Sequence, residues 1–577
     1  MNFFTDDEDL QLIFRHLIDW KPIILEVEGE DFLDNKYYLE TKDPKFEMAP
    51  DSVENALDFY ESSLTSLGEF LGEEVYPIAK EIDHKGLKYE NGKVIFPKEQ
   101  IELYEKFKAT GLMPYSIARS GGGLGMPQTI GALFAMLMAR ADVAFCMTTT
   151  LLNLAQIVNR YGTVEQNEKY TLPASSGDVL FAMALTEPDF GSDLNNVRTV
   201  ATKMEDGSFR ITGSKRFISQ GCGIGNYPAT LLTLARIGKQ NGARGLSVFL
   251  VKSSEAQIAG IEKKMGIHSS PTCEIVYENT KAELLGEEGL GLTRYTAGMT
   301  NFMRLASAAG GPGGGAAALY ECKKYARERI QFGKPIEEIP AVKEMIHKIE
   351  RETNAMRLIT LETARIIDLY QHSQIRMEKQ GISDKEIRKN ENIRSYSSLA
   401  SILTPLAKYY CSEEANKLAY LAIQIHGGAG YTEDYNVAKL YRDSRINSIY
   451  EGTSQIHVRI ATGAIVAGMT EEGYFRKYLN SLKLEIKSPS QFLIEQSEIL
   501  DAAIQAFRKI ESDEIKERVA ENLIIITARY LGSILYERAL QKLENTNAIE
   551  RWTKDSRSYL IDSTAIAKAC IYRIENT

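Results

Sequence analysis

Cysteine and histidine are scarce in this sequence. Its 577 residues include 6 cysteines and 7 histidines, and it contains neither a Cys-x-x-Cys pair nor a His-x-x-x-His pair. Structural zinc sites need closely spaced ligands of these kinds, and disulfide frameworks need many paired cysteines. The sequence therefore predicts reduced thiols and no metal site. His268, His426 and His457 have no serine or cysteine motif beside them, so we interpret them as structural.

Long apolar runs and blocks of like charge are also missing. The apolar stretches fall well short of the ~20 residues that a membrane-spanning helix requires, so we expect no integral membrane segment. A net charge of -10 without charge blocks argues against nucleic acid and anionic membranes as general partners. The start, MNFFTDDEDLQLIF, is acidic where a signal peptide would be basic. These features predict a cytoplasmic protein.

The patterns that are present divide the chain into helical and strand-like parts. Residues 1–178 look helical. In 52–82, apolar residues recur at spacings of three and four residues, which is typical of a surface helix, whereas 129–158 is apolar on nearly all sides, which is typical of a buried helix. Residues 179–285 contain short segments rich in Val, Ile, Thr and Phe, which predict strands. Asp206-Gly207 fits the turn of a hairpin between two of them.

Helical patterns return after the predicted strands. Long amphipathic segments in 286–468 predict a bundle of antiparallel helices. Residues 469–577 predict a further, appended helical set. Over 471–577 the chain has 16 basic and 17 acidic residues, so this tail is not a basic arm. The expected fold class is therefore α+β with several domains.

One carboxylate has unusual neighbours. Glu451 follows Ile449 and Tyr450, and Gly452 comes directly after it. In a structural interpretation it precedes a helix that Thr453 caps, where the helix dipole stabilises an acid by ~0.3–1 kcal/mol. In a functional interpretation it is a general base, because apolar neighbours make a carboxylate more basic and the glycine lets a substrate approach. This stretch alone leaves both interpretations open.

A second stretch offers polar groups at the end of a predicted strand. In FAMALTEPDFGSDLNNVRT (181–199), Thr186 and Ser192 carry hydroxyls, while Pro188 and Gly191 favour an open turn that leaves N–H groups outside the sheet. As a bare pattern this could be any β turn.

Five segments together point to one family. They are FAMALTEPDFGSDLNNVRT, GSKRFIS (213–219), ARERIQFGKPI (326–336), QIHGGAGY (424–431) and IYEGTSQI (449–456). In order and spacing the chain resembles the acyl-CoA dehydrogenase family. Through KKMGIHSSPTCEIVYEN (263–279) it is most similar to the longer bacterial members with an extra C-terminal helical domain, the group that includes 3-methylmercaptopropionyl-CoA dehydrogenase.

The resemblance implies a fold and a cofactor. The expected parts are an N-terminal extension and helical domain (1–178), a middle β domain (179–285), a four-helix bundle (286–468) and an appended helical domain (469–577). The implied cofactor is FAD, held between the β domain and the bundle of one subunit and reached by a second subunit. The implied cofactor-binding residues are Leu185, Thr186, Gly191, Ser192, Phe217, Ser219, Arg329, Gln331, Gln424, Gly427, Gly428, Thr453 and Gln455.

The resemblance also implies a reaction, the α,β-dehydrogenation of an acyl-CoA to trans-2-enoyl-CoA, as in fatty acid β-oxidation. Glu451 is the implied base, and Ser192, Arg304 and Gly452 are the implied substrate contacts. Some family members carry the base just before the CoA arginine, but Met303 stands there and cannot accept a proton. Glu451 is therefore the candidate base.

The implied partners are an electron-transfer flavoprotein and further copies of the chain, as a dimer or a dimer of dimers. Two other functions remain open. An acyl-CoA oxidase of this fold would pass electrons to O2. A non-catalytic relative of the alkylation-response type would bind acyl-CoA or DNA, although the DNA-binding relatives use a basic C-terminal region, which the tail counted above does not provide.

Overall fold

The computed structural model describes residues 1–238 and 240–577, which divide into two units. Unit 1 contains residues 1–6 and 28–306, and unit 2 contains residues 7–27 and 307–577. Along the chain, the boundary near residue 306 falls inside a single helix, α12 (Ala297–Glu328).

The helices of unit 1 come mainly before its sheet. They are α3 (Leu33–Thr41), α4 (Val53–Phe70), α5 (Tyr76–Lys85), α6 (Lys98–Ala109), α7 (Gln128–Ala141), α8 (Val143–Leu152), α9 (Ala155–Tyr161), α10 (Val164–Gln166) and α11 (Leu172–Ser175). The stretch 129–158, expected as one buried helix, forms three. Asp142 ends the first helix in extended conformation and caps the second, its side chain accepting a hydrogen bond from the Phe145 N–H. The prediction of burial is confirmed, but the local capping bond overrides the continuous apolar pattern.

Unit 1 also contains a seven-stranded sheet, in the order β3-β6-β4-β5-β9-β7 with β8 beside β9. An additional pairing between β6 and β7 closes the ring β6-β4-β5-β9-β7, which makes a small barrel. The predicted hairpin turn is confirmed, since Gly207 has φ +80° and its N–H donates to the Met204 carbonyl at 3.0 Å. The strands are β3 (Leu180–Ala184), β4 (Val200–Lys203), β5 (Phe209–Ser219), β6 (Ala229–Ile237), β7 (Leu246–Lys252), β8 (Gln257–Ile261) and β9 (Thr272–Leu285); a separate hairpin pairs β1 (Lys88–Glu90) with β2 (Lys93–Ile95).

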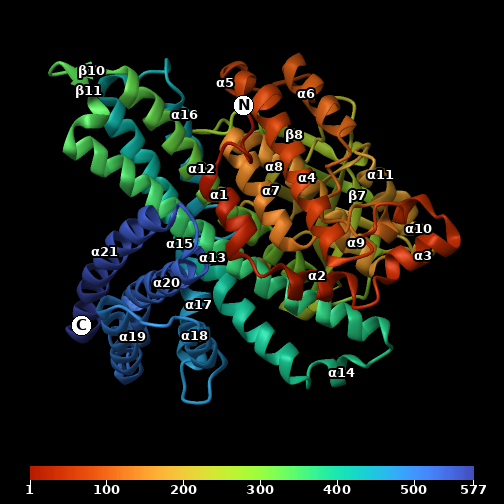
Figure 1. The fold of residues 1–577 in the computed structure, drawn as a ribbon. Coiled ribbons are helices and arrows are strands. Elements are labelled where there is room, and N and C mark those ends of the chain that lie inside the picture. The colour runs from red at the N-terminus through yellow and green to blue at the C-terminus, as the bar shows by residue number, and fades with distance from the viewer. Residues whose placement is uncertain (239) are drawn as a thin grey trace. The chain divides into compact units, whose positions relative to one another are not determined.

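Unit 2 is a bundle of long helices with a second helical set after it (Figure 1). The bundle comprises the later part of α12, α13 (Pro340–Lys379), α15 (Glu391–His426), α16 (Asn436–Ser444) and α17 (Ser454–Gly468), with the short α14 (Asp384–Ile387) and the hairpin of β10 (Ile330–Gln331) and β11 (Lys334–Pro335). The second set is α18 (Tyr474–Leu484), α19 (Gln491–Lys509), α20 (Asp513–Leu543) and α21 (Ile549–Glu575). None of the described helices is both long enough and apolar enough to cross a membrane.

A buried ionic network joins the second helical set to the bundle. Arg529 of α20 is 4% exposed and donates to both carboxylate oxygens of Glu352 on α13, at 2.8 and 2.9 Å. Those two bonds come from Nη1 of Arg529, and its Nη2 donates to Glu414 on α15 at 2.9 Å. Tyr410 adds a hydrogen bond to Glu352 at 3.0 Å. The appended helices therefore share a polar core with the bundle.

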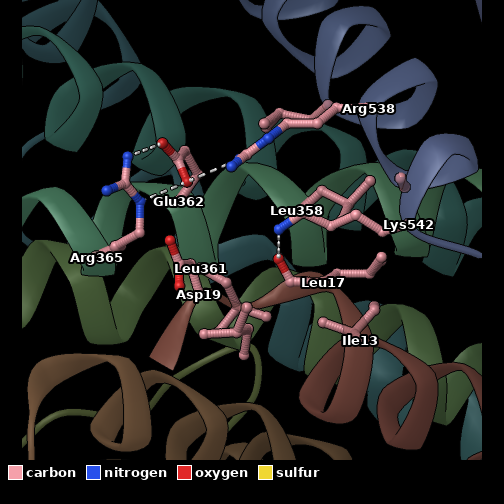
Figure 2. A pocket seen from close by; sticks show the side chains of 12 residues that line it. Ile13, Leu17, Asp19, Leu358, Leu361, Glu362, Arg365, Arg538 and Lys542 are labelled. Atoms are coloured by element: carbon pink, nitrogen blue, oxygen red, sulfur yellow. Dashed lines mark hydrogen bonds and ion pairs between the residues drawn. The ribbon is translucent and has the colours of Figure 1, made fainter. Parts of the chain in front are cut away.

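The N-terminal segment of unit 2 lies against both helical sets. Its helices are α1 (Glu8–Leu12) and α2 (Trp20–Glu28). Buried Asp9 accepts from Asn354 on α13 and from Arg551 and Trp552 on α21. Figure 2 shows a nearby cavity in which Glu362 points toward Arg365 and Arg538. With a volume of about 40 Å³ it holds no more than a water or two, so it is a packing gap rather than a ligand site.

Glu362 predicts a pH dependence of stability. Burial alone would raise the pKa of its carboxyl, but Arg365, Arg538 and Tyr478 outweigh burial and lower the pKa from 4.5 to about 2. Since the folded-state pKa is the lower one, the carboxylate stabilises fully above pH 4.5, and its contribution, roughly 3 kcal/mol, is lost as pH falls from 4.5 to about 2. Urea titrations of wild type and Glu362→Gln at several pH values should show a difference in unfolding free energy that shrinks over this window. A pH-independent difference would contradict the assignment.

Candidate active site

In unit 2, Glu451 lies on a short loop between a 3₁₀ turn (Arg445–Ser448) and α17. It is half-buried and has φ +56°, and Gly452 follows with φ +96°. A left-handed conformation costs a residue with a Cβ about 1–2 kcal/mol, so the surroundings must hold Glu451 in place. Thr453 is the N-cap residue of α17, as predicted, but its side chain caps none of the described N–H groups.

Two buried side chains contact the backbone of this loop. The Lys408 Nζ on α15 donates to the Asn447 carbonyl at 2.6 Å and to the Gly452 carbonyl at 3.0 Å. The His457 Nε2 on α17 lies 3.1 Å from the Glu451 carbonyl oxygen. From the sequence we interpreted His457 as structural and did not single out Lys408. Lys408 could have been noticed, because a lysine between Leu406-Ala407 and Tyr409-Tyr410 stands in an unusually apolar setting.

The loop borders open space. Gln455, exposed on the first turn of α17, lines a groove of about 1,020 Å³ together with Arg445, Ser448 and residues of α13, α15, α16, α20 and α21. This volume is at the upper end of the range of ligand pockets, ~300–1,000 Å³. Residues before and after Glu451 along the chain thus line a groove within unit 2, whereas Glu451 itself is not one of its lining residues.

Other predicted residues of unit 2 lie at the hairpin of β10 and β11, which Figure 1 labels, and at the end of α15. Arg329 and Gln331 are exposed at the β10–β11 hairpin, and the Arg329 guanidinium makes no ion pair with any described residue. Gln424, Gly427 and Gly428 are exposed at the end of α15. Tyr325 and His426, whose rings stack with centroids 4.3 Å apart, join these two places.

Gly427 ends α15 with φ +59°, and a Cβ at Gly427 or Gly428 would meet no described atom within 4 Å. Gly427 is thus the C-cap residue of α15. The same open space gives a ligand close access to the backbone.

In unit 1 the structure gathers the predicted residues of the β domain around a turn after β3. Leu185 is buried and Thr186 half-buried, and Gly191 and Ser192 are exposed. Glu187 and Phe190 close the turn through mutual backbone hydrogen bonds of 3.0 and 3.1 Å. The Thr186 carbonyl accepts from the Arg216 N–H at 2.9 Å, which ties the turn to β5.

A bulge in β5 exposes Phe217. The pairing with β9 shifts between Lys215 and Ile218, and Phe217 adopts φ +61° with 55% of its surface exposed. Ser219, two residues further, is half-buried and pairs with Thr272. A large aromatic side chain turned outward by a bulge is available for stacking.

A buried ion pair fixes this turn from inside. Lys215, 0% exposed, donates to the Leu185 carbonyl at 2.9 Å and to Glu187 at 3.0 Å. Burial lowers the pKa of Lys215 to about 8, against the opposite effect of Glu187. Burial would raise the pKa of Glu187, but Lys215, the Thr199 hydroxyl and two backbone N–H groups hold it below its ordinary value. Both groups are thus charged at neutral pH.

Arg304 and Met303 lie on the part of α12 that belongs to unit 1. Arg304 is half-buried, with an Nη1–Asn301 Oδ1 distance of 3.4 Å, and Met303 is buried. The predicted residues thus fall into two groups, Leu185 to Arg304 in unit 1 and Arg329 to Gln455 in unit 2.

The residues present suit a flavin nucleotide. Unit 1 presents an exposed aromatic ring beside a turn with hydroxyls and backbone groups. Unit 2 presents Arg329, which has no ion pair among the residues that the structure describes, and two uncrowded glycines at the place that the Tyr325–His426 stack joins to it. A planar ring system can stack on the first set, and a pyrophosphate can bind the second through charge-assisted hydrogen bonds.

Three family profiles match consecutive parts of the chain. The profile described as acyl-CoA dehydrogenase, N-terminal domain, matches residues 61–178. The middle-domain profile of the same family matches residues 182–280. The C-terminal-domain profile matches residues 289–385 and 387–465.

Individual proteins are similar over most of the chain. A 3-methylmercaptopropionyl-CoA dehydrogenase of Ruegeria pomeroyi is 32% identical over 443 residues, 73% of this chain and 73% of that protein. The structure of butyryl-CoA dehydrogenase from Megasphaera elsdenii has a TM-score of 0.59 and 27% identity, covering 71% of this chain and 98% of its own. The structure of acyl-CoA dehydrogenase complexed with FAD from Bacillus anthracis has a TM-score of 0.72 and 22% identity, and the match covers 89% of this chain and 88% of that chain. The fold likeness therefore extends beyond the residues that the profiles match.

Proposed function

Because this chain belongs to the acyl-CoA dehydrogenase family of oxidoreductase enzymes, we propose that it converts an acyl-CoA thioester to trans-2-enoyl-CoA, with FAD as cofactor and Glu451 as base. The observation that carries this proposal is the conformation at Glu451. A half-buried carboxylate held in a left-handed conformation, with Gly452 after it, suits a functional base better than a helix cap.

The chemistry assigned to Glu451 is removal of a proton from Cα of the acyl group. A thioester oxygen that accepts hydrogen bonds makes this proton more acidic, and we assign one of those bonds to the Glu451 N–H. FAD, when bound, supplies the acceptor for the hydride that leaves Cβ. Gly452 leaves room for the thioester, and Arg304 and Ser192 are proposed contacts of the CoA part. Met303 offers no competing base.

We assign FAD binding to residues of both units. Those of unit 1 hold the flavin ring, and Thr453 and Gln455 add contacts from the start of α17. Arg329, Gln331, Gln424, Gly427 and Gly428 bind the pyrophosphate and ADP part in a second copy of the chain, so the proposed enzyme is a dimer or a dimer of dimers. We also propose the division into parts at 178, 285 and 468, which the ranges of the three profiles support.

Arg329→Ala is expected to weaken FAD binding by about 10-fold or more, since a hydrogen bond to a charged group contributes ~1.5–3 kcal/mol. The affinity can be measured by titrating FAD-stripped protein and following flavin fluorescence. Arg327→Ala is the matched control, because Arg327 is also exposed but pairs with Glu337 at 3.4 Å. Equal FAD affinities of the two variants would contradict the role of Arg329.

For the electron acceptor we propose an electron-transfer flavoprotein, with O2 as the alternative. Reduced enzyme is to be mixed with either acceptor, and flavin reoxidation and peroxide are measured. We expect the flavoprotein to reoxidise the flavin faster than O2 does, and we expect little peroxide. Stoichiometric peroxide would indicate an oxidase.

The proposed function is tested by mixing the FAD-loaded protein anaerobically with short-, medium-, long- and branched-chain acyl-CoAs. At least one should bleach the visible flavin absorbance and yield an enoyl-CoA lighter by two hydrogens. Failure of the whole series, with FAD bound, would reject the proposal.

A further inference from the structure

The carbonyl groups around Glu451 are held by side chains from two helices. Lys408 of α15 is 0% exposed, and its ammonium bonds to the carbonyls of Asn447 and Gly452, which lie on opposite sides of Glu451 along the chain. The same ammonium lies 5.8 Å from the centre of the Tyr450 ring. One buried cation therefore fixes both ends of the segment that carries the proposed base.

His457 holds the middle of that segment. It is 0% exposed on α17, and its Nε2 lies 3.1 Å from the Glu451 carbonyl. Because a carbonyl only accepts, Nε2 must carry the hydrogen of this bond. A Cβ at Gly452 would come within 3.1 Å of the same nitrogen, so a side chain at this position would crowd the His457 ring against the backbone at Glu451.

We propose that Lys408 and His457 are positioning residues for Glu451, an inference that rests on the proposed role of that carboxylate. They turn the carbonyls of Asn447, Glu451 and Gly452 toward α15 and α17 and so hold the left-handed backbone from which the Glu451 side chain projects. Without them the backbone relaxes and the carboxylate moves. A displacement of ~1 Å is enough to slow a reaction by about 10²-fold while substrate binding persists.

The test compares Lys408→Met, His457→Phe and His457→Gln in the full-length, FAD-loaded protein. Lys408→Met and His457→Phe remove the donors and should lower kcat about 10²-fold with KM changed by less than about 3-fold. His457→Gln keeps an N–H donor and should retain most of the activity. Hydrogen–deuterium exchange of backbone amides in 447–457 should rise in the first two variants and not in the third.

Lys439→Met is the matched control. Lys439 is another buried lysine of unit 2, bound to Asp443 at 2.6 Å on α16. Its loss should lower thermal stability yet leave kcat per bound flavin unchanged. If Lys408→Met does not fold, the pair of His457 variants decides. The inference fails if wild type is active and Glu451→Gln inactive, yet His457→Phe matches wild type in both kcat and amide exchange. If wild type shows no acyl-CoA activity, the proposed function fails, and the exchange data alone decide whether these side chains hold the loop.

Discussion

Replacing Glu451 with glutamine is expected to lower kcat for acyl-CoA dehydrogenation by about 10²–10⁴-fold, the contribution typical of a positioned general base. Glutamine has nearly the same shape as glutamate, so FAD content and acyl-CoA affinity should stay close to those of wild type. The amide cannot accept the Cα proton, and anaerobic mixing with substrate should therefore leave the flavin oxidised. Stopped-flow absorbance measures this directly.

Glu471→Gln is the control for this experiment, because Glu471 is an exposed glutamate of the same unit. It should reduce its flavin at the wild-type rate. Wild-type kcat in Glu451→Gln would remove Glu451 from the mechanism. Loss of FAD in that variant would instead assign the residue a part in cofactor binding.

The second large effect concerns stability. Arg529→Met should lower the unfolding free energy of unit 2 by about 3–5 kcal/mol, because it leaves the Glu352 carboxylate buried without its cation. It also removes one of the two cations that bind Glu414, which keeps only Lys417 at 2.8 Å. Methionine fills most of the volume of the arginine side chain, so the loss of stability reports the missing charge rather than a cavity. Urea unfolding followed by circular dichroism measures the effect.

Arg459→Met provides the comparison. Arg459 on α17 also faces α20, but its ion pair with Glu517 is 4.0 Å long, with both side chains more than 70% exposed. Such a surface pair contributes at most ~1 kcal/mol, so this variant should be nearly as stable as wild type. Equal losses in the two variants would contradict the view that the buried network binds the appended helices to the bundle.

Features set by neighbouring residues were predictable from the sequence. The hairpin at Gly207 and the helix that begins after Thr453 depend on a few adjacent residues, and the structure confirms both. The helix break at Asp142 is equally local but was missed, because the apolar pattern continues through Asp142. The capping bond from the Phe145 N–H to its side chain does not show in that pattern.

Contacts between distant parts of the chain were not predictable in this way. Lys408 reaches carbonyls 39 and 44 residues further along, and Asp9 bonds to Trp552, 543 residues away. No local period encodes such pairings, because they follow from how helices pack. For the same reason, the sequence pointed to Glu451 itself but not to the side chains that hold its backbone.

The central claim, that Glu451 removes the Cα proton, is tested most directly by separating proton removal from hydride transfer. An acyl-CoA with sulfur in place of Cβ offers no hydride, but its Cα hydrogens can still exchange. In D2O, nuclear magnetic resonance should show these hydrogens exchanging in the presence of the FAD-loaded wild-type enzyme and remaining in place with Glu451→Gln. Exchange at the wild-type rate in the variant would contradict the account.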